Sequence, residues 1–221
     1  MVENTIKTVA IIPIRTHSTR IKKKSFKLFA GIPLYQFFLQ KLIDSPFDEI
    51  YVDTDSKEIS DFVTQKGWAV IERLPELTSN STNGNDLLLH HASLVDADIY
   101  FQLFITSPLL AAATIHKAHE IMTTQFEFDS LFTALKIFSW FWFDGKPVNY
   151  DPKSFPRSQD AIPIIRETTG LYAIRSEALK TIKTRIGSKP HMLFVNDAEA
   201  TDIDREIDFK IAEFLLHQTT I

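Results

Sequence analysis

Cationic side chains crowd together near the start of the chain. Directly after the apolar run 8–14, ten residues contain Arg15, Arg20, Lys22, Lys23 and Lys24. An apolar run of this kind is typical of a buried strand, which fixes the base of the loop that follows it. Arginine and lysine supply the countercharge that a polyanion such as a nucleoside triphosphate needs. The segment therefore indicates a phosphate site, with an ordinary solvated basic loop as the alternative.

A pair of carboxylates lies near the other end of the chain. Asp202 and Asp204 are separated only by Ile203. In extended backbone, side chains two residues apart point the same way. Two carboxylates on one side can hold Mg²⁺, which in proteins takes a few carboxylates together with phosphates and water. The alternative is that Asp204 caps the helix that follows and Asp202 is simply solvated.

The first third of the chain alternates between strand and helix patterns. We expect strands over 7–14, 49–55 and 69–73 and helices over 33–43 and 57–66. This order predicts an α/β fold, a mostly parallel sheet with helices on both faces. Because ligands of such sheets bind outside the carboxyl ends of the strands, Arg15, Asp55 and Arg73 should gather at one edge.

The remaining patterns extend this sheet and interrupt it once. A polar turn over 80–85 precedes further expected elements: a helix over 86–93, strands over 98–105, 130–135 and 170–174, and helices over 114–123 and 206–216. Residues 136–165 change character, with Phe138, Trp140, Trp142 and Phe143 followed by prolines. We interpret this stretch as an inserted arm, and the whole chain, 1–221, as a single domain.

Bulk composition excludes several classes of protein. The chain has 221 residues, a net charge of −4 and no cysteine, which excludes thiolate chemistry and disulfides and argues against a nucleic-acid partner. Its apolar runs fall short of the ~20 residues needed to cross a bilayer. The start of the chain lacks the basic and apolar regions of a secretory leader. We expect a cytoplasmic protein with no membrane association.

Several motifs, in order and spacing, resemble those of the acylneuraminate cytidylyltransferases and, more distantly, the CMP-Kdo synthetases. The resemblance covers nearly the whole chain. The matching segments are Ala10-Ile11-Ile12-Pro13-Ile14-Arg15, Ser18, Lys24, Lys27 to Leu34, Val52-Asp53-Thr54-Asp55, Arg73 to Leu77, Thr106-Ser107-Pro108-Leu109, Arg157-Ser158-Gln159-Asp160, Arg166 to Tyr172, Asp202-Ile203-Asp204, Asp208-Phe209 and Ala212-Glu213.

The resemblance implies a Rossmann-like nucleotidyltransferase fold and a reaction. CMP would pass from CTP to an acidic acceptor of the nonulosonic or sialic type, with release of pyrophosphate. The implied catalytic residues are Arg15, Lys24 and Asp204. CTP would be bound by Arg15, Ser18, Lys24, Ser25, Arg73 and Asn85. The acceptor would meet Phe104, Arg157, Gln159 and Tyr172, and Asp202 and Asp204 would hold Mg²⁺. The arm implies a homodimer, with Arg157 close to the partner's site.

The chain also departs from the family pattern. Its phosphate loop lacks the usual glycine beside Ser18, Ser25 replaces an asparagine, and Phe104 replaces a glutamine. The cations and the carboxylates are kept, whereas several acceptor-side polar residues are not. We therefore expect an acceptor other than ordinary N-acetylneuraminate, such as another nonulosonic acid, a related keto-sugar acid or a small phosphonate.

Other interpretations of these residues stay open. The chain could be a nucleotidyltransferase that uses another base, or a homologue that binds nucleotide or a partner without turnover. Tyr172 could be a core residue with a satisfied hydroxyl, and Arg73 could be a surface ion-pair residue. An arm that folds back on its own core is the alternative to a dimer.

Overall fold

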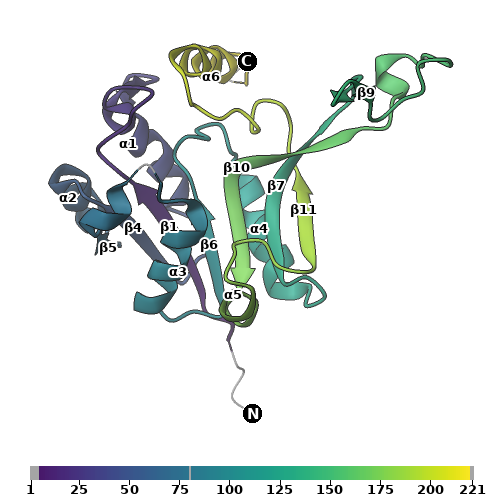
Figure 1. Cartoon of the computed structure of the whole chain (residues 1–221). Coiled ribbons are helices and arrows are strands. Elements are labelled where there is room, and N and C mark those ends of the chain that lie inside the picture. Colours follow the sequence, from purple (N-terminus) through teal and green to yellow (C-terminus); the bar gives the residue numbers. More distant parts are fainter. Residues whose placement is uncertain (1–4, 80, 220–221) are drawn as a thin grey trace.

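The centre of the molecule is a seven-stranded sheet with the order β11-β7-β10-β6-β1-β4-β5 (Figure 1). The structure is a computed structural model that describes residues 5–79 and 81–219. Two predictions fall outside the described residues. The absence of a secretory leader concerns residues 1–4, and the predicted polar turn includes Asn80.

Half of the sheet is parallel, as the alternating patterns predict. β1 (Thr8–Ile14) pairs in parallel with β4 (Glu49–Thr54) and β6 (Ile99–Leu103), and β5 (Ala69–Glu72) pairs in parallel with β4. Nearly every residue of β1 is buried, because helices cover both faces of the sheet, and this explains its unbroken apolar sequence. Parallel strands bring the loops after β1, β4 and β5 to one edge.

The other half contains the sheet's antiparallel strand. β10 (Ile164–Arg175) runs antiparallel to both β6 and β7 (Ser130–Ile137), and β11 (Pro190–Phe194) is parallel to β7. The strand predicted over 170–174 is only the buried end of β10. Its first half was missed because polar residues there break the apolar run.

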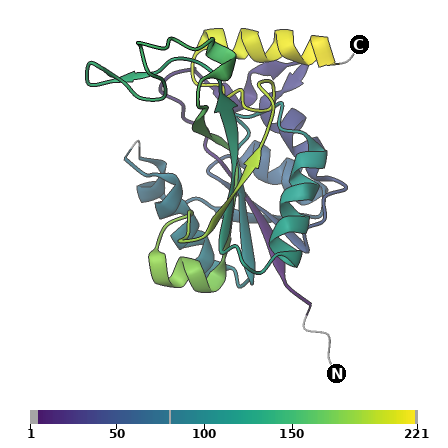
Figure 2. The same ribbon diagram turned by 90° about the vertical axis from the view of Figure 1, so that its right-hand side faces the viewer.

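Helices cover both faces of the sheet (Figure 2). The larger core lies on the face covered by α1 (Leu34–Leu39), α2 (Lys57–Gln65) and α4 (Ala112–Thr124). The opposite face is covered by α3 (Gly84–Leu94) and α5 (Ser176–Ile182). α6 (Glu206–Thr219) lies across the edge formed by the carboxyl end of β1 (Figures 1 and 2). The short elements are η1 (Lys24–Phe26), β2 (Leu28–Phe29), β3 (Ile32–Pro33), η2 (Gln40–Leu42) and η3 (Pro75–Thr78).

The start of α3 differs from its prediction for a local reason. The helix begins at Gly84, before the predicted range 86–93, because Asn83 is its N-cap. The Asn83 side chain accepts hydrogen bonds from the backbone N–H groups of Asn85 and Asp86, and Asp86 accepts one from the Asn83 N–H in return. This reciprocal capping box fixes where the helix starts beside the cavity described below.

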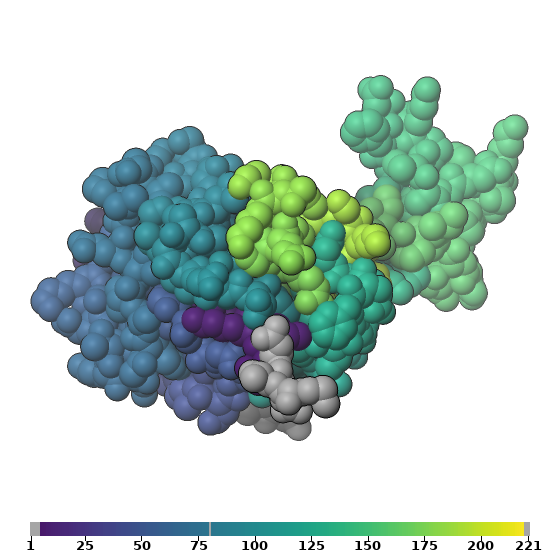
Figure 3. All heavy atoms as spheres, turned by 90° about the horizontal axis from the view of Figure 1, so that it is seen from below, coloured from purple at the N-terminus to yellow at the C-terminus, as the bar shows by residue number. Residues whose placement is uncertain are grey.

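An arm projects from the body between β7 and β10 (Figures 1 and 3). It carries β8 (Trp142–Phe143), β9 (Lys146–Pro147) and η4 (Ser158–Asp160). The insertion predicted at 136–165 corresponds to this projection, except that its first and last residues belong to β7 and β10. Across 5–79 and 81–219, none of the helices combines the length and the apolar content that crossing a bilayer requires.

Candidate functional site

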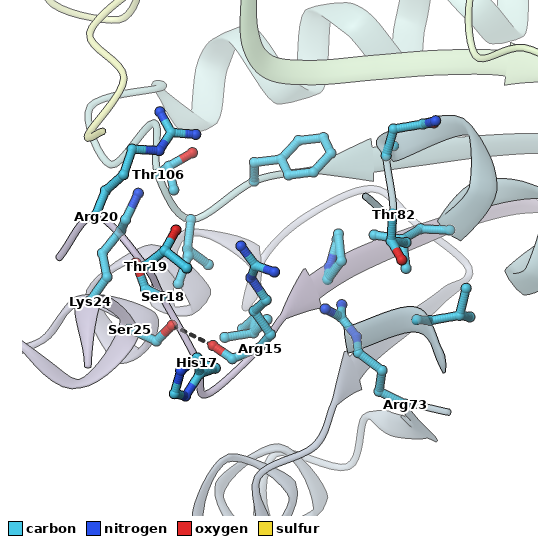
Figure 4. A pocket seen from close by; sticks show the side chains of 18 of the residues that line it. Arg15, His17, Ser18, Thr19, Arg20, Lys24, Ser25, Arg73, Thr82 and Thr106 are labelled. Atoms are coloured by element: carbon cyan, nitrogen blue, oxygen red, sulfur yellow. Dashed lines mark hydrogen bonds between the residues drawn. The ribbon is translucent and has the colours of Figure 1, made fainter. Parts of the chain in front are cut away.

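A cavity of about 300 Å³ opens at the carboxyl end of β1 (Figure 4). Its walls come from the basic loop after β1, the segment around η3, the N-terminus of α3, the turn after β6 and the loop before α6. The residues predicted from the sequence that line it are Arg15, Ser18, Lys24, Ser25, Arg73, Phe104 and Asp204. Residues from both ends of the chain therefore surround one cavity.

Lys24 is a buried cation of this cavity. Lys23, just before η1, adopts the left-handed conformation with φ 52°, and the turn leaves Lys22 and Lys23 exposed while Lys24 faces inward. Lys24 Nζ donates a hydrogen bond to the carbonyl of Ile203 and lies 3.7 Å from Asp204 Oδ1. Burial lowers the pKa of Lys24, and the negative charge of Asp204 opposes that shift.

The two carboxylates before α6 have different surroundings. Asp204 forms an ion pair with Arg20, from the basic loop, as well as facing Lys24. Asp202 Oδ1 is buried and has no hydrogen-bond partner within the described chain. Burial raises the pKa of Asp202, hydrogen bonds from Thr106 lower it, and the like charge of Asp204 raises it further. The two carboxylates therefore repel each other.

Side-chain hydrogen bonds hold the basic loop in place without glycine. Arg15 Nη1 donates to the carbonyl of Thr78 at 3.3 Å, which ties the loop to the segment after β5. The Ser25 hydroxyl donates to the Arg15 carbonyl at 3.1 Å, drawn as a dashed line in Figure 4. Ser18 Oγ accepts from the Ile21 N–H at 3.4 Å. The loop thus keeps a defined shape although it lacks the residue that phosphate loops usually use.

Arg73 lines the cavity from a buried ion-pair network. Its Nε and Nη2 donate to the Asp53 carboxylate at 2.9 Å and 2.7 Å, and His91 Nε2 lies 2.8 Å from Asp53 Oδ2. Asp53 and the Arg73 and His91 side chains are almost fully buried. Although burial opposes it, hydrogen bonds from His91 and Arg73 hold the pKa of Asp53 below its usual value. Arg73 is therefore not the surface ion-pair residue of the alternative interpretation.

A second and larger cavity, of about 770 Å³, adjoins the first. Its lining includes Arg166, Glu167, Thr169, Asp202, Asp204 and Arg205. Asp204 lines both cavities, whereas Asp202 lines only the second. Two ligands that occupied the two cavities would therefore meet beside Asp204.

The carboxylates fit a magnesium ion that substrate phosphates help to hold. Within 5–79 and 81–219, no group of three or more His, Cys, Asp or Glu side chains could form a complete metal site. Mg²⁺ commonly binds through one or two carboxylates plus substrate phosphates and water. The unpartnered Oδ1 of Asp202 and the mutual repulsion of the two carboxylates are the features that a bound cation would relieve.

Four of the predicted site residues line neither cavity. Arg157 and Gln159 lie on the projecting arm, where Arg157 pairs with Asp160 at 2.7 Å. Tyr172 is buried, and its hydroxyl donates to Glu167 instead of facing an acceptor. The side chain of Asn85 accepts a hydrogen bond from the Arg185 N–H, and Asn83 and Gly84 line the first cavity in its stead. Phe104, predicted on the acceptor side, lines the first cavity and not the second.

Two arginines of the site were not among the predicted site residues. Arg20 was expected only as one of the five cations of the basic loop, and its pairing with Asp204 joins that loop to the carboxylates. Arg185 lies in the loop after α5, with its guanidinium carbon 3.6 Å from the centre of the Tyr172 ring. The sequence carries no signal for Arg185, because neither α5 nor the loop after it was predicted to reach this edge.

Solved structures place this fold among the nucleotidyltransferases. CMP:2-keto-3-deoxy-manno-octonic acid synthetase in complex with CTP superimposes with a TM-score of 0.69 at 17% identity, over 96% of this chain and 99% of that one. The 4-diphosphocytidyl-2C-methyl-D-erythritol synthase of Anaerococcus prevotii superimposes with a TM-score of 0.67 at 12% identity, over 96% of each chain. At such identities the likeness establishes the fold alone.

The sequence itself establishes the family. The cytidylyltransferase family model matches residues 9–221, and the chain belongs to that family. It is 27% identical to N-acylneuraminate cytidylyltransferase A of Danio rerio over 92% of this chain and 49% of the relative. It is 27% identical to 3-deoxy-manno-octulosonate cytidylyltransferase of Acidobacterium capsulatum over 82% of this chain and 78% of the relative. The chain spans about half the length of the N-acylneuraminate enzymes it matches.

Proposed function

We propose that this protein transfers CMP from CTP to an acidic sugar, releasing pyrophosphate. The observation that carries the proposal is the meeting of Lys24 with Asp204 where the two cavities join. Family membership supports a cytidylyltransferase, and the relatives named above act on N-acylneuraminate and 3-deoxy-manno-octulosonate.

The first cavity is the proposed nucleotide site. Its cations come from two segments: Arg15, Arg20 and Lys24 from the basic loop, and Arg73 from the end of β5. Fixed cations in a partly buried site stabilise the negative charge that develops on a departing pyrophosphate, and they need no rearrangement to do so. Ser18 and Ser25 add hydroxyl groups beside them. The base and ribose would extend toward Gly84 and Phe104, at the far wall.

Asp202 and Asp204 are the proposed Mg²⁺ ligands. A bound Mg²⁺ would supply Lewis-acid polarisation of the phosphate and would help to acidify the attacking hydroxyl. Lys24 pairs with Oδ1 of Asp204 and Arg20 pairs with Oδ2, which fixes the orientation of this carboxylate. The protein therefore contributes positioning and charge, which are the main requirements of phosphoryl chemistry.

The second cavity is the proposed acceptor site. An oxygen of the acceptor would bond to the α-phosphorus, the bond from that phosphorus to the bridging oxygen would break, and pyrophosphate would leave with the bonding electrons. The acceptor hydroxyl gives up its proton to solvent in the process. A cavity of about 770 Å³ is large enough for a nonulosonic acid.

Pyrophosphate release from CTP tests the proposal. The enzyme, CTP and Mg²⁺ are incubated with N-acetylneuraminate, 3-deoxy-manno-octulosonate, pseudaminate or a small phosphonate, and the CMP product is identified by mass. We expect pyrophosphate and a CMP conjugate with at least one of these acids. Binding of CTP without pyrophosphate release from any of them would favour a homologue that binds nucleotide without turnover.

The base used is tested separately by thermal protection. CTP, UTP and GTP are compared at equal concentration, because a ligand that binds only the folded protein raises its melting temperature. We expect CTP to protect most. Stronger protection by UTP or GTP would support the alternative of a nucleotidyltransferase with another base.

We further propose that the protein is a homodimer and that it works in the cytoplasm without a nucleic-acid partner. The arm exposes Trp142, Phe143, Phe155 and Ile162, and large apolar surfaces of this kind usually mark interfaces. Arg157 and Gln159, which lie outside both cavities of their own chain, would then reach the acceptor site of the partner. The negative net charge supports the absence of a nucleic-acid partner, and the need for CTP supports a cytoplasmic location.

A further inference from the structure

Arg185 sits on an aromatic surface between the two cavities. Its guanidinium carbon is 3.6 Å from the centre of the Tyr172 ring and 5.9 Å from that of Phe104. Phe104 lines the first cavity. The nearest carboxylate, Glu167, lines the second cavity, and its Oε1 is 3.6 Å from Arg185 Nη2. The side chain thus joins a wall of the proposed nucleotide site to a wall of the proposed acceptor site.

Three local features hold Arg185 at this junction. Its backbone N–H donates to Asn85 Oδ1 at 2.9 Å, which anchors the loop to the start of α3. A β-carbon at position 84 would overlap Arg185 Nη1, so the glycine there leaves room for the guanidinium. A bulge between Glu167 and Tyr172 shifts the register of β10 against β7. These two residues are five positions apart and would face opposite ways in a regular strand, but the bulge lets them meet.

The guanidinium is well packed but poorly paired. In the described part of the chain, its side-chain nitrogens make no hydrogen bond, and Glu167 is their one anionic neighbour, beyond hydrogen-bond distance. Arg175, by contrast, donates to the carbonyls of Phe128, Met122 and Gln125, as a structural arginine does. The Arg185 side chain is 23% exposed and its partner Glu167 is 42% exposed. Its donor groups therefore remain available to a ligand with oxygen atoms in a planar arrangement.

We propose that Arg185 is the residue that recognises the carboxylate of the acceptor, replacing its weak contact with Glu167 by a paired hydrogen-bonded one. This rests on the proposed function. A guanidinium matches a carboxylate with two parallel hydrogen bonds, and stacking on Tyr172 fixes its plane in advance. Arg157, the arginine expected from the sequence to hold the carboxylate, lies on the projecting arm, where it pairs with Asp160. Arg185 lines neither cavity itself but contacts a residue of each. The arginines that line the second cavity are already engaged, since Arg166 donates to the Ala200 carbonyl and Arg205 pairs with Asp208.

The test compares an acid with its neutral derivative. Arg185→Met is assayed for pyrophosphate release with whichever acid of the panel the wild type uses, and with the methyl ester of that acid. Lys183→Met removes an exposed cation two residues away and is the matched control. We expect Arg185→Met to lower kcat/KM for the acid by roughly 100-fold and for the ester by less than about threefold, with the KM for CTP unchanged. Arg185→Lys should recover part of the loss.

Each outcome bears on a different part of the account. Equal losses for the acid and the ester would assign Arg185 a packing role only, as would an unchanged acid rate. Melting temperatures of the variants show whether a loss of activity follows from unfolding. If Arg185→Met unfolds, Arg185→Lys replaces it in the test: because it keeps the charge, it should retain more activity toward the acid than Arg185→Met, and equal losses would assign Arg185 a packing role. No turnover of any acid by the wild type would overturn the proposed function, and the role of Arg185 with it.

Discussion

Lys24 Nζ and Asp204 Oδ1 lie 3.7 Å apart, although nearly the whole sheet separates them in the chain. The contact exists because the loop after β1, the first strand of the sheet, and the segment before α6, the last helix, meet at the same edge. Burial makes the amino group of Lys24 costly to charge, and Asp204 offsets that cost. In the proposed function, an anionic ligand beside Lys24 with a cation between that ligand and Asp204 would complete the arrangement.

Replacement of Lys24 by methionine should reduce turnover with little effect on folding. The variant removes the buried cation beside Asp204, so kcat/KM for CTP should fall by about 10²–10³-fold. Pyrophosphate release under initial-rate conditions measures this loss. Lys22→Met, on the same loop but exposed, should stay within about twofold of the wild type. Similar rates for both variants would mean that Lys24 is only part of a general positive potential.

Asp53 should be one of the most stability-sensitive carboxylates in the protein. Asp53→Asn leaves Arg73 with a buried, unpaired charge, so the free energy of unfolding in urea should fall by about 3 kcal/mol. The KM for CTP should rise as well, because Arg73 lines the first cavity. Asp61→Asn breaks an exposed pair with Lys57 and should cost less than about 0.5 kcal/mol. Equal costs for the two variants would contradict this account of Arg73.

Lys41 gives the fold a pH dependence in the alkaline range. Burial lowers its pKa to about 8 from 10.5, against the opposing charge of Glu199. Between these values the unfolded chain binds more protons than the folded one, so the Lys41 contribution to stability rises with pH across this window.

The matched comparison for Lys41 is Lys41→Met. Lys41 Nζ donates hydrogen bonds to the carbonyls of Pro108 and Leu110. The variant loses both hydrogen bonds and should therefore be less stable than the wild type. The difference in the free energy of unfolding between wild type and variant should grow from pH 7.5 to 9.5. A difference independent of pH in that range would show that Lys41 titrates normally in the fold.

Metal removal should abolish turnover in a way that depends on Asp202. With EDTA present, pyrophosphate release should stop, and added Mg²⁺ should restore it. Asp202→Asn should raise the Mg²⁺ concentration needed for half-maximal activity by at least about tenfold. Glu206→Gln, which removes a nearby carboxylate outside both cavities, should leave that concentration unchanged. Full activity in EDTA would exclude the proposed metal role.

The arm should control assembly. Replacing Trp142 and Phe143 by serine removes two large exposed apolar side chains, so a dimer at micromolar concentration should become a monomer in light scattering. Lys153→Ser, an exposed arm residue without an apolar side chain, is the control. A wild-type chain that is already monomeric would remove the homodimer proposal.

The sequence predicted most of the parallel half of the fold because each buried strand there is an unbroken apolar run. It also predicted that the loops after β1, β4 and β5 would meet, and Asp55 does accept a hydrogen bond from the Thr16 N–H at 2.7 Å. The start of β10 was missed because Arg166 and Glu167 line a cavity and carry no apolar signal. β11 was missed because only Leu193 in it is buried.

The candidate site was predicted where local sequence fixes a residue at the end of a strand, as for Arg15 and Arg73. It was not predicted where three-dimensional packing decides the outcome. Tyr172 follows the pattern of a site residue, but the bulge in β10 turns it under Arg185. Arg185 itself comes from a loop whose path depends on the capping of α3 and on the space at Gly84. No spacing rule along the chain could reveal either placement.

A crystal structure with CTP and Mg²⁺ tests the central claim most directly. The account predicts one nucleotide whose triphosphate contacts both Arg15 and Lys24, with a metal on the same phosphates ligated by Asp202 and Asp204 at about 2.0–2.1 Å. A triphosphate bound away from Lys24, or a metal held apart from the nucleotide, would contradict it.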